Sequence, residues 1–312
     1  MEENNRQALK NVLKNRTQKS VKWGRALIYA VLILYTVFLV FPFLVIVITS
    51  FVGVEEYMDA QSFIWIPKNF SVESYTTILL NDPYTQELGM PILLKGFINT
   101  LWITLIPLFS GLFMSALVAY CYSKHNFPGK NALFMISVTT MFIPLGAFGF
   151  IGYLFYQELG WTVGPAAVLP LIVPGLFGSV GTIFFLRPYM DGVSGEIIEA
   201  AKVDGMGFWR IFFNIVLPLS KPAIIAQFIF GFVGGYNNYA GALLYLGSGD
   251  LSLWTLQLSL TEILNYSTAG MAGGAAPLKC AAALIALIPL IILYVFCQRY
   301  FIEGVSFGGG RD

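Results

Sequence analysis

The sequence predicts an all-α integral membrane protein with six transmembrane helices. The 312-residue chain is 57% hydrophobic and only 11% charged, whereas an ordinary soluble domain carries about 25% charged residues. A soluble fold of this length could not bury so much apolar surface, so lipid must be the solvent for much of it. Six apolar stretches are also long enough to cross a bilayer, which takes about 20 helical residues. These stretches are 26–50, 97–122, 132–155, 164–186, 223–246 and 278–301.

The N-terminal segment, residues 1–25, is expected to lie in the cytoplasm. It carries seven Lys and Arg residues before the first apolar stretch. That stretch, at about 25 residues, is too long for the core of a cleavable signal peptide. The sequence therefore predicts a first transmembrane helix with a basic cytoplasmic anchor, inside a permease domain that spans 26–301.

The first loop between spans, 52–95, is predicted to be the largest extracytoplasmic piece. It holds six acidic residues against two lysines. A mobile acidic cap and a contact surface for a soluble, substrate-delivering protein both explain this composition, and the sequence does not choose between them.

The distribution of Lys and Arg predicts the orientation, because basic residues concentrate in cytoplasmic loops. Of the 18 Lys and Arg residues, 15 fall in the N-terminal segment, the loop near residues 124–130, the loop 187–221 and the C-terminal tail. Only three fall on the opposite side. Both termini and the 190–222 loop are therefore expected in the cytoplasm.

Proline residues lie inside five of the six predicted spans. Within a bilayer the backbone must satisfy its own hydrogen bonds, so helices remain the expected structure and the prolines predict kinks or breaks. These residues are Pro42, Pro107, Pro144, Pro170, Pro174 and Pro289.

The cytoplasmic loop 190–222 is predicted to form a compact helix–turn–helix knob. Ser194 is a suitable N-cap for a short helix, and Gly205 with Gly207 ends that helix because glycine readily takes the required backbone angles. A second short helix over 208–216 runs to Pro218, where it must stop or bend.

This loop resembles the "EAA" loop of bacterial ABC-importer permeases. Residues 199–205 read E-A-A-K-V-D-G and residues 215–222 read I-V-L-P-L-S-K-P, which fits the family pattern in order and spacing. The resemblance implies the type I ABC importer permease fold, in which this loop is a coupling helix that docks on a separate ATPase. The coupling residues that it implies are Glu199, Ala200, Ala201, Asp204, Gly205 and Pro218.

Further motifs are similar to the carbohydrate-uptake, MalG-like branch of these permeases. Residues 99–101 read N-T-L, and residues 120–130 read Y-C-Y-S-K-H-N-F-P-G-K, similar to the family's loop A-Y-x-x-x-R-x-x-F-P-G-[RK]. The ending at 298–304, Q-R-Y-F-I-E-G, is similar to Q-R-[YF]-F-[IV]-x-G and precedes a Gly-rich cytoplasmic tail, 302–312. In such relatives the tail reaches into the ATPase dimer. That role is implied here for Phe307, Gly308, Gly309 and Gly310.

The fifth span contains a polar patch that is a candidate part of the substrate pathway. Residues 236–239 read Y-N-N-Y and resemble the family's W-N-[DE]-[FY], with tyrosine in place of tryptophan and asparagine in place of an acid. These side chains could hydrogen-bond or stack on a sugar, or could form hydrogen bonds between packed helices. Both interpretations stay open for Tyr236, Asn237, Asn238 and Tyr239.

The resemblance implies several partners. The sequence has no G-x-x-x-x-G-K-[ST] phosphate loop, so ATP-Mg is expected on two separate ATPase subunits, with no cofactor on this chain. A second permease subunit, an extracytoplasmic solute-binding protein and a carbohydrate, expected to be an oligosaccharide, complete the set in a bacterial plasma membrane. An ABC permease for another solute class and, more remotely, an ion-coupled secondary transporter are the alternatives. The latter would place ionisable residues within its spans.

Catalysis, metal binding and nucleic-acid binding are not expected. The sequence shows no paired carboxylates, metal-ligand cluster or nucleophile–base set, so we expect no catalytic residue, no metal site and no enzyme activity. The three cysteines lie in apolar stretches without metal-ligand spacing, and a net charge of +1 gives no basic footprint for nucleic acid. The only histidine, His125, is expected to be a solvated surface residue.

Overall fold

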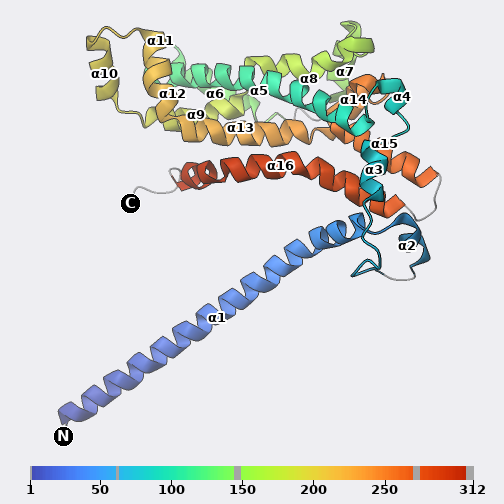
Figure 1. The fold of residues 1–312 in the computed structure, drawn as a ribbon. Coiled ribbons are helices and arrows are strands. Elements are labelled where there is room, and N and C mark those ends of the chain that lie inside the picture. Colours follow the sequence, from blue (N-terminus) through green and yellow to red (C-terminus); the bar gives the residue numbers. More distant parts are fainter. Residues whose placement is uncertain (1, 61–62, 144–148, 270–274, 307–312) are drawn as a thin grey trace.

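The computed structural model describes residues 2–60, 63–143, 149–269 and 275–306, which are mostly helical. Figure 1 shows α5, α9, α13 and α16 running lengthwise beside one another, with α10 and α11 at one end and α3, α4, α14 and α15 at the other. The helices are α1 (Glu2–Ser50), α2 (Val54–Asp59), α3 (Glu73–Leu79), α4 (Thr85–Leu88), α5 (Ile92–Lys124), α6 (Lys130–Thr140), α7 (Gly149–Glu158), η2 (Gly164–Val168), α8 (Leu169–Ile172), η3 (Val173–Phe177), α9 (Val180–Asp191), α10 (Gly195–Val203), α11 (Phe208–Ile211), η4 (Phe212–Val216), α12 (Leu217–Leu219), α13 (Lys221–Tyr236), α14 (Tyr239–Leu246), η5 (Leu251–Leu253), α15 (Leu256–Ala269) and α16 (Ala275–Ser306).

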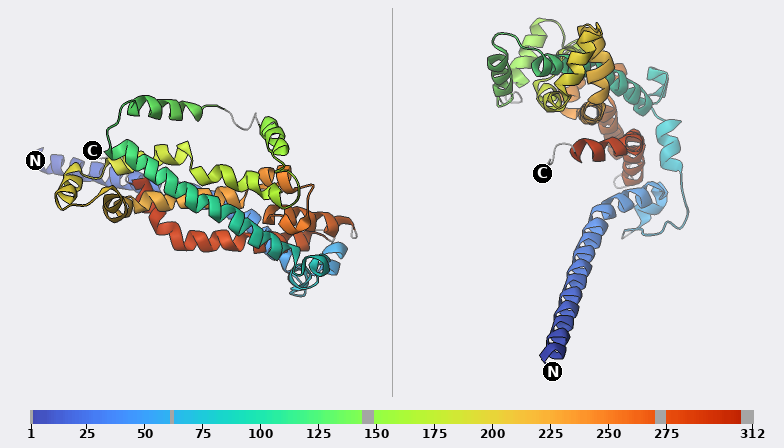
Figure 2. Two further views of the ribbon diagram at one scale, coloured as in Figure 1. Left: turned by 90° about the horizontal axis from the view of Figure 1, so that it is seen from above. Right: turned by 90° about the vertical axis from the view of Figure 1, so that its left-hand side faces the viewer.

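The first predicted span and the basic segment before it form one helix, α1, of 49 residues. Gly24 stands where the two parts meet without interrupting the helix, and Pro42 lies inside it. The apolar part, Leu27–Ser50, is long enough to cross a membrane and is almost wholly exposed. Figures 1 and 2 show α1 diverging from the other helices toward its N-terminus. Its apolar surface is therefore available to lipid or to another membrane protein.

The third predicted span differs from the structure. In place of one helix over 132–155, the described residues contain α6, which ends at Thr140, and α7, which begins at Gly149. Pro144, between them, is outside the described residues. At a rise of 1.5 Å per residue, each of these helices is roughly 15 Å long, too short to cross the bilayer alone.

The fourth and fifth predicted spans are interrupted helices. Residues Gly164–Asp191 form an apolar run of sufficient length, but it is divided into η2, α8, η3 and α9, and prolines stand at the starts of the first three pieces. The fifth span breaks at Asn237, because the Asn238 side chain accepts a hydrogen bond from the Gly241 backbone N–H (3.0 Å) and so begins α14.

Length and composition identify four membrane-spanning segments in the described part of the chain, and a fifth if a bent pair is counted as one span. The bent pair joins 208–219 to α13 at 76°. The expectation of an all-α membrane fold is confirmed, but three of the six predicted spans are divided into separate helices. Prolines account for the divisions of the fourth span, and asparagine capping accounts for the division of the fifth.

Helix α5 lies at the centre of the bundle, where it packs against η3, α9, α13 and α15. Small residues make the contacts close: a methyl group at Gly111 would overlap the carbonyl oxygen of Gly175, and one at Gly235 would lie 2.5 Å from the Thr104 methyl group. The Ser115 hydroxyl accepts a hydrogen bond from the Ser179 backbone N–H (3.0 Å). Small residues and hydroxyl groups are what membrane helices use to pack tightly.

The N-terminal part of α5 also forms hydrogen bonds with the segment before α15, at the end of the bundle away from α10 and α11. The Asn99 amide donates to the backbone carbonyls of Ser252 and Trp254, both at 2.8 Å, and the Thr100 hydroxyl accepts from the Leu256 backbone N–H at 2.8 Å. The N-T-L motif therefore fixes the segment that enters α15. These buried bonds satisfy backbone groups that would otherwise be costly to bury.

The contact at Gly111 gives a testable prediction. Gly111→Ala should destabilise the protein by about 1–3 kcal/mol, because the added methyl group meets backbone and cannot be relieved by a side-chain rotation. Gly152→Ala in α7 is the matched control, since no atom lies within 4 Å of its added methyl group. Thermal unfolding of the purified protein in detergent measures both, and equal midpoints for the two variants would contradict the packing described here.

Candidate functional site

The first candidate site is a helical knob, residues 194–219, which comprises α10, α11, η4 and α12. Its first helix begins as the sequence predicted: the Ser194 hydroxyl accepts from the Glu196 backbone N–H (3.2 Å). The helix ends at Val203, and Gly205, two residues later, has a φ of +78°. The backbone N–H groups of Gly205 and Met206 donate to the carbonyls of Lys202 (3.0 Å) and Ala201 (2.9 Å). This paired arrangement is a Schellman motif, which requires a left-handed residue that glycine supplies at least cost.

The knob is seated on the ends of α5 and α9. Ile198 and Ala201 of α10 are both 5% exposed and belong to one buried cluster with residues of α5, α9 and η4. Burial of this kind is the main source of attachment between packed elements. A displacement of the knob therefore has to be shared by the helices beneath it. The partners in the cluster include Tyr120, Leu186, Met190, Ile211, Phe212 and Val216.

Two residues of the 120–130 motif reinforce this seat. The Lys124 ammonium donates to the backbone carbonyls of Asp191 (3.1 Å) and Val193 (2.7 Å), where a cation also interacts favourably with the carboxyl end of α9. The His125 ring packs between Tyr120 and Phe208, with centroid separations of 5.1 and 5.0 Å. The expectation of a solvated surface role for His125 is therefore wrong.

The environment of His125 keeps its ring neutral. Burial, followed by the positive charges of Lys202 and Lys130, lowers the pKa of His125 below its usual value of 6.5. A neutral ring packs against aromatic neighbours without the desolvation cost of a charge. Because the folded pKa lies below the unfolded one, this packing is most stable above pH 6.5 and weakens as the pH falls.

The outer face of the knob carries the predicted coupling residues. Glu199, Ala200, Asp204 and Gly205 are exposed there, whereas Ala201 faces the core. Beside them the apolar side chains of Ile197 and Val203 are 48% and 88% exposed. This face of the knob is therefore open to a partner protein.

Glu199 forms an ion pair with Lys202 on this outer face. The carboxylate and the ammonium are 2.8 Å apart, and their side chains are 71% and 49% exposed respectively. A pair in contact with water contributes at most about 1 kcal/mol. Glu199 can therefore exchange Lys202 for a group on a docking partner at little cost.

A bend joins the knob to the span that follows. The chain passes through the π-helical turn η4 and through α12, with the exposed Pro218 in its first turn, and reaches the 76° bend at Ser220. The sequence placed this bend at Pro218, and the structure places it two residues later. π-helical turns are frequent at functional sites, and this one connects the knob to α13.

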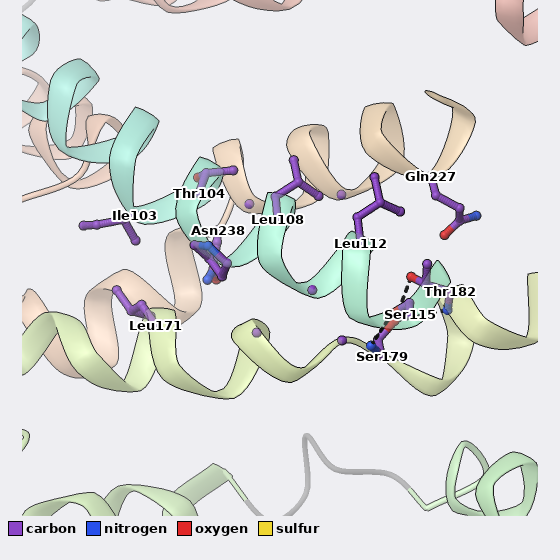
Figure 3. Close-up of a pocket in the computed structure, with 16 residues that line it drawn as sticks. Ile103, Thr104, Leu108, Leu112, Ser115, Leu171, Ser179, Thr182, Gln227 and Asn238 are labelled. Atoms are coloured by element: carbon purple, nitrogen blue, oxygen red, sulfur yellow. Dashed lines mark hydrogen bonds between the residues drawn. The ribbon is translucent and has the colours of Figure 1, made fainter. Parts of the chain in front are cut away.

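The second candidate site is a groove between α5, α13 and the segment from α8 to the start of α9 (Figure 3). Its volume is about 290 Å³ and all sixteen of its lining residues are uncharged. Glycine, proline and leucine form much of the wall. Hydroxyl and amide groups supply its polarity, from Thr104, Ser115, Ser179, Thr182, Gln227 and Asn238.

Only one of the four predicted pathway residues lines this groove. Tyr236 is 1% exposed, and its hydroxyl donates to the Ala286 carbonyl of α16 (2.7 Å). Of the two interpretations left open by the sequence, Tyr236 therefore fits a hydrogen bond between packed helices. The Asn237 amide donates to the Val233 carbonyl (3.0 Å). Asn238 lines the groove and also caps α14, whereas Tyr239 is 39% exposed and is not among the lining residues.

Sequence reasoning missed Gln227, the other amide in the groove. The signal was present, because Gln227 is the only amide or ionisable residue between Ala223 and Tyr236, and polar residues inside a span are expensive and usually functional. The predicted tail residues Phe307, Gly308, Gly309 and Gly310 lie outside the described residues.

Comparisons with known proteins agree with this architecture. Residues 111–306 match the family described as "Binding-protein-dependent transport system inner membrane component". Among curated proteins, the chain is similar to the polygalacturonan/rhamnogalacturonan transport system permease protein YtcP of Bacillus subtilis. The two are 32% identical, over 90% of this chain and 96% of YtcP.

Further similarities extend over much of the chain. The arabinooligosaccharides transport system permease protein AraQ of Bacillus subtilis is 30% identical over 78% of this chain and 80% of its own. A solved bacterial ABC transporter involved in the import of the acidic polysaccharide alginate superposes with a TM-score of 0.74. That match covers 88% of this chain and 96% of the other, at 21% identity, and it supports the fold.

Proposed function

Because this chain belongs to the family of binding-protein-dependent transport system inner membrane components, we propose that it is one half of the pore of an ATP-driven oligosaccharide importer. The observation that carries this proposal is the helical knob: it exposes Val203 and Glu199 on one side and is anchored by Ile198 and Ala201 on the other. Such a knob can receive force from a partner and pass it to the bundle.

The partner that we propose at the knob is an ATPase subunit, which binds ATP-Mg itself. This chain carries no phosphate loop, so hydrolysis occurs on a separate polypeptide, and we assign no enzyme activity to the permease. Two ATPase subunits would contact the two halves of the pore. The exposed apolar part of α1 (Leu27–Ser50) is a surface on which a second permease subunit could pack.

The proposed orientation places both termini and the knob in the cytoplasm. The excess of Lys and Arg on that side supports it. On the opposite side, the 52–95 segment and the residues around α15 would face an extracytoplasmic solute-binding protein.

The carbohydrate assignment rests on the relatives. YtcP, AraQ and the diacetylchitobiose uptake system permease protein NgcG of Streptomyces coelicolor are all named for saccharide transport. The uncharged, hydroxyl- and amide-bearing groove is chemically suited to a sugar. Secondary transport is less well supported, because an ion-coupled carrier needs ionisable groups in its pathway and the residues lining this groove carry none.

Uptake by whole cells tests the proposal. Deleting the gene should abolish uptake of at least one labelled oligosaccharide from a panel of arabinotriose, maltotriose, diacetylchitobiose and trigalacturonate. Restoring the gene should return it. Uptake should cease when ATP is depleted and persist when a proton uncoupler is added with ATP maintained. Unchanged uptake of the whole panel in the deletion strain would contradict the carbohydrate assignment, and the reverse inhibitor pattern would favour an ion-coupled carrier.

The turn of the knob gives a second prediction. Gly205→Val should lower sugar transported per ATP hydrolysed at least fivefold while the protein stays inserted, because a β-branched residue strains the left-handed backbone by roughly 1–2 kcal/mol. Gly205→Asn is the matched control and should keep most of the coupling, since asparagine tolerates this conformation. Uptake and phosphate release in proteoliposomes measure the ratio. A Gly205→Val variant with the wild-type ratio would remove the turn from the coupling mechanism.

A further inference from the structure

Gln227 has an amide with no partner inside a membrane-spanning helix. It lies in α13 six residues after Lys221, lines the groove and is partly exposed to it. No group in the described part of the chain makes a hydrogen bond to this amide. Polar residues inside a membrane span are expensive and usually mark a substrate or ion pathway. A ligand in the groove that forms a hydrogen bond with the Gln227 amide would therefore explain why a glutamine occupies this position.

The polar groups of the groove gather at its two ends. Figure 3 shows Thr104 and Asn238 near one end, and Ser179, Thr182 and Gln227 near the other, with Leu108 and Leu112 between them. Gln227 lies nine residues before Tyr236, the last residue of α13, which is roughly 14 Å at 1.5 Å per helical residue, and Asn238 follows two residues later. That separation exceeds one sugar ring, so a ligand that contacts both ends must be an oligomer.

The chemistry of the lining limits the charge of the ligand. None of the sixteen lining residues has an ionisable side chain. Amide and hydroxyl side chains both donate and accept, which matches sugar hydroxyl groups. A carboxylate moved into this surrounding would lose its hydration without gaining a cation. The groove is therefore suited to a neutral ligand.

We propose that this groove binds a neutral oligosaccharide during transport, and that Gln227 is its specificity-determining contact at the end nearer the knob. This inference rests on the function proposed above. It adds the charge class of the cargo and a residue that sequence reasoning did not identify. It also assigns Asn238 the second contact, although the capping bond from Asn238 to α14 makes Gln227 the cleaner position to test.

The experiment uses the complete importer, with its second permease subunit, ATPase and binding protein, in proteoliposomes. Labelled arabinotriose, maltotriose and diacetylchitobiose are the neutral probes and trigalacturonate is the acidic one. Sugar uptake and ATP hydrolysis are recorded together at saturating loaded binding protein. The wild type should transport a neutral probe and should transport trigalacturonate at least tenfold more slowly.

Three variants test the contribution of the Gln227 side-chain amide to transport. Gln227→Met keeps the length of the side chain and removes its hydrogen bonds, and should lower sugar transported per ATP about tenfold while ATP hydrolysis is still stimulated. Gln227→Asn retains an amide and should recover part of the loss. Gln257→Met is the control, because Gln257 donates to Tyr236 O and Asn237 Oδ1 (both 3.4 Å) and does not line the groove. It should keep the wild-type ratio.

The outcomes separate this inference from the function on which it rests. No ATP-dependent uptake of any probe by the wild type would overturn both. Transport of trigalacturonate alone would leave the importer intact and overturn the neutral groove. A Gln227→Met variant with the wild-type ratio would overturn the contact. A variant that loses stimulated ATP hydrolysis along with uptake would also overturn it, because the role of Gln227 would then be structural.

Discussion

The close packing of α5 against η3 and α13 is the constraint on which the other features depend. At Gly111 the helix meets the backbone of η3, and at Thr104 it meets Gly235 of α13, with no room for an additional methyl group at either glycine. Without hydrophobic association to hold helices together in lipid, contacts of this kind and interhelical hydrogen bonds must do so. The same helix begins with the bonds of Asn99 to the 252–254 backbone and ends with Lys124 against the end of α9.

This arrangement connects the knob to the groove by short routes. The knob rests on α5 and α9 through Ile198 and Ala201, and η4 leads through the bend at Ser220 directly into α13. The groove is formed by those same elements. We propose that a push on the knob changes the spacing of α5, α9 and α13, and with it the width of the groove. Contacts between packed elements are discrete rather than continuously deformable, so the groove would switch between two states.

The sequence predicted the elements better than their continuity. Composition and apolar length identified the membrane fold, and the Ser194 cap and Gly205 turn follow from local backbone chemistry that is readable without tertiary contacts. The break at Asn237 was not predicted, because an asparagine inside an apolar run caps a helix only when the backbone around it bends. Hydropathy alone did not place the division between α6 and α7, but Pro144, which predicted a kink or break in this span, falls between them.

The two candidate sites also differ in how far the sequence predicted them. The helix and turn of the knob were predicted because one local segment forms them, and the coupling role of its residues stays a prediction. The groove needs three segments far apart in sequence, so Tyr236 was proposed for a pathway although its ring packs on α16, and Gln227 was overlooked. A single glutamine in an apolar span indicates that something polar lies nearby. Only the packing of α5 and η3 beside α13 shows that Gln227 lines a groove.

The central claim, that the knob docks on a separate ATPase, is tested most directly by crosslinking at Val203. A photo-crosslinking residue placed at this 88% exposed position should, in membranes that contain the whole importer, form an adduct with a polypeptide whose peptides include a phosphate-binding loop. The same residue at Val163, which is 69% exposed beside the start of η2, should not form that adduct. An ATPase adduct at neither position, with the importer active, would contradict the account.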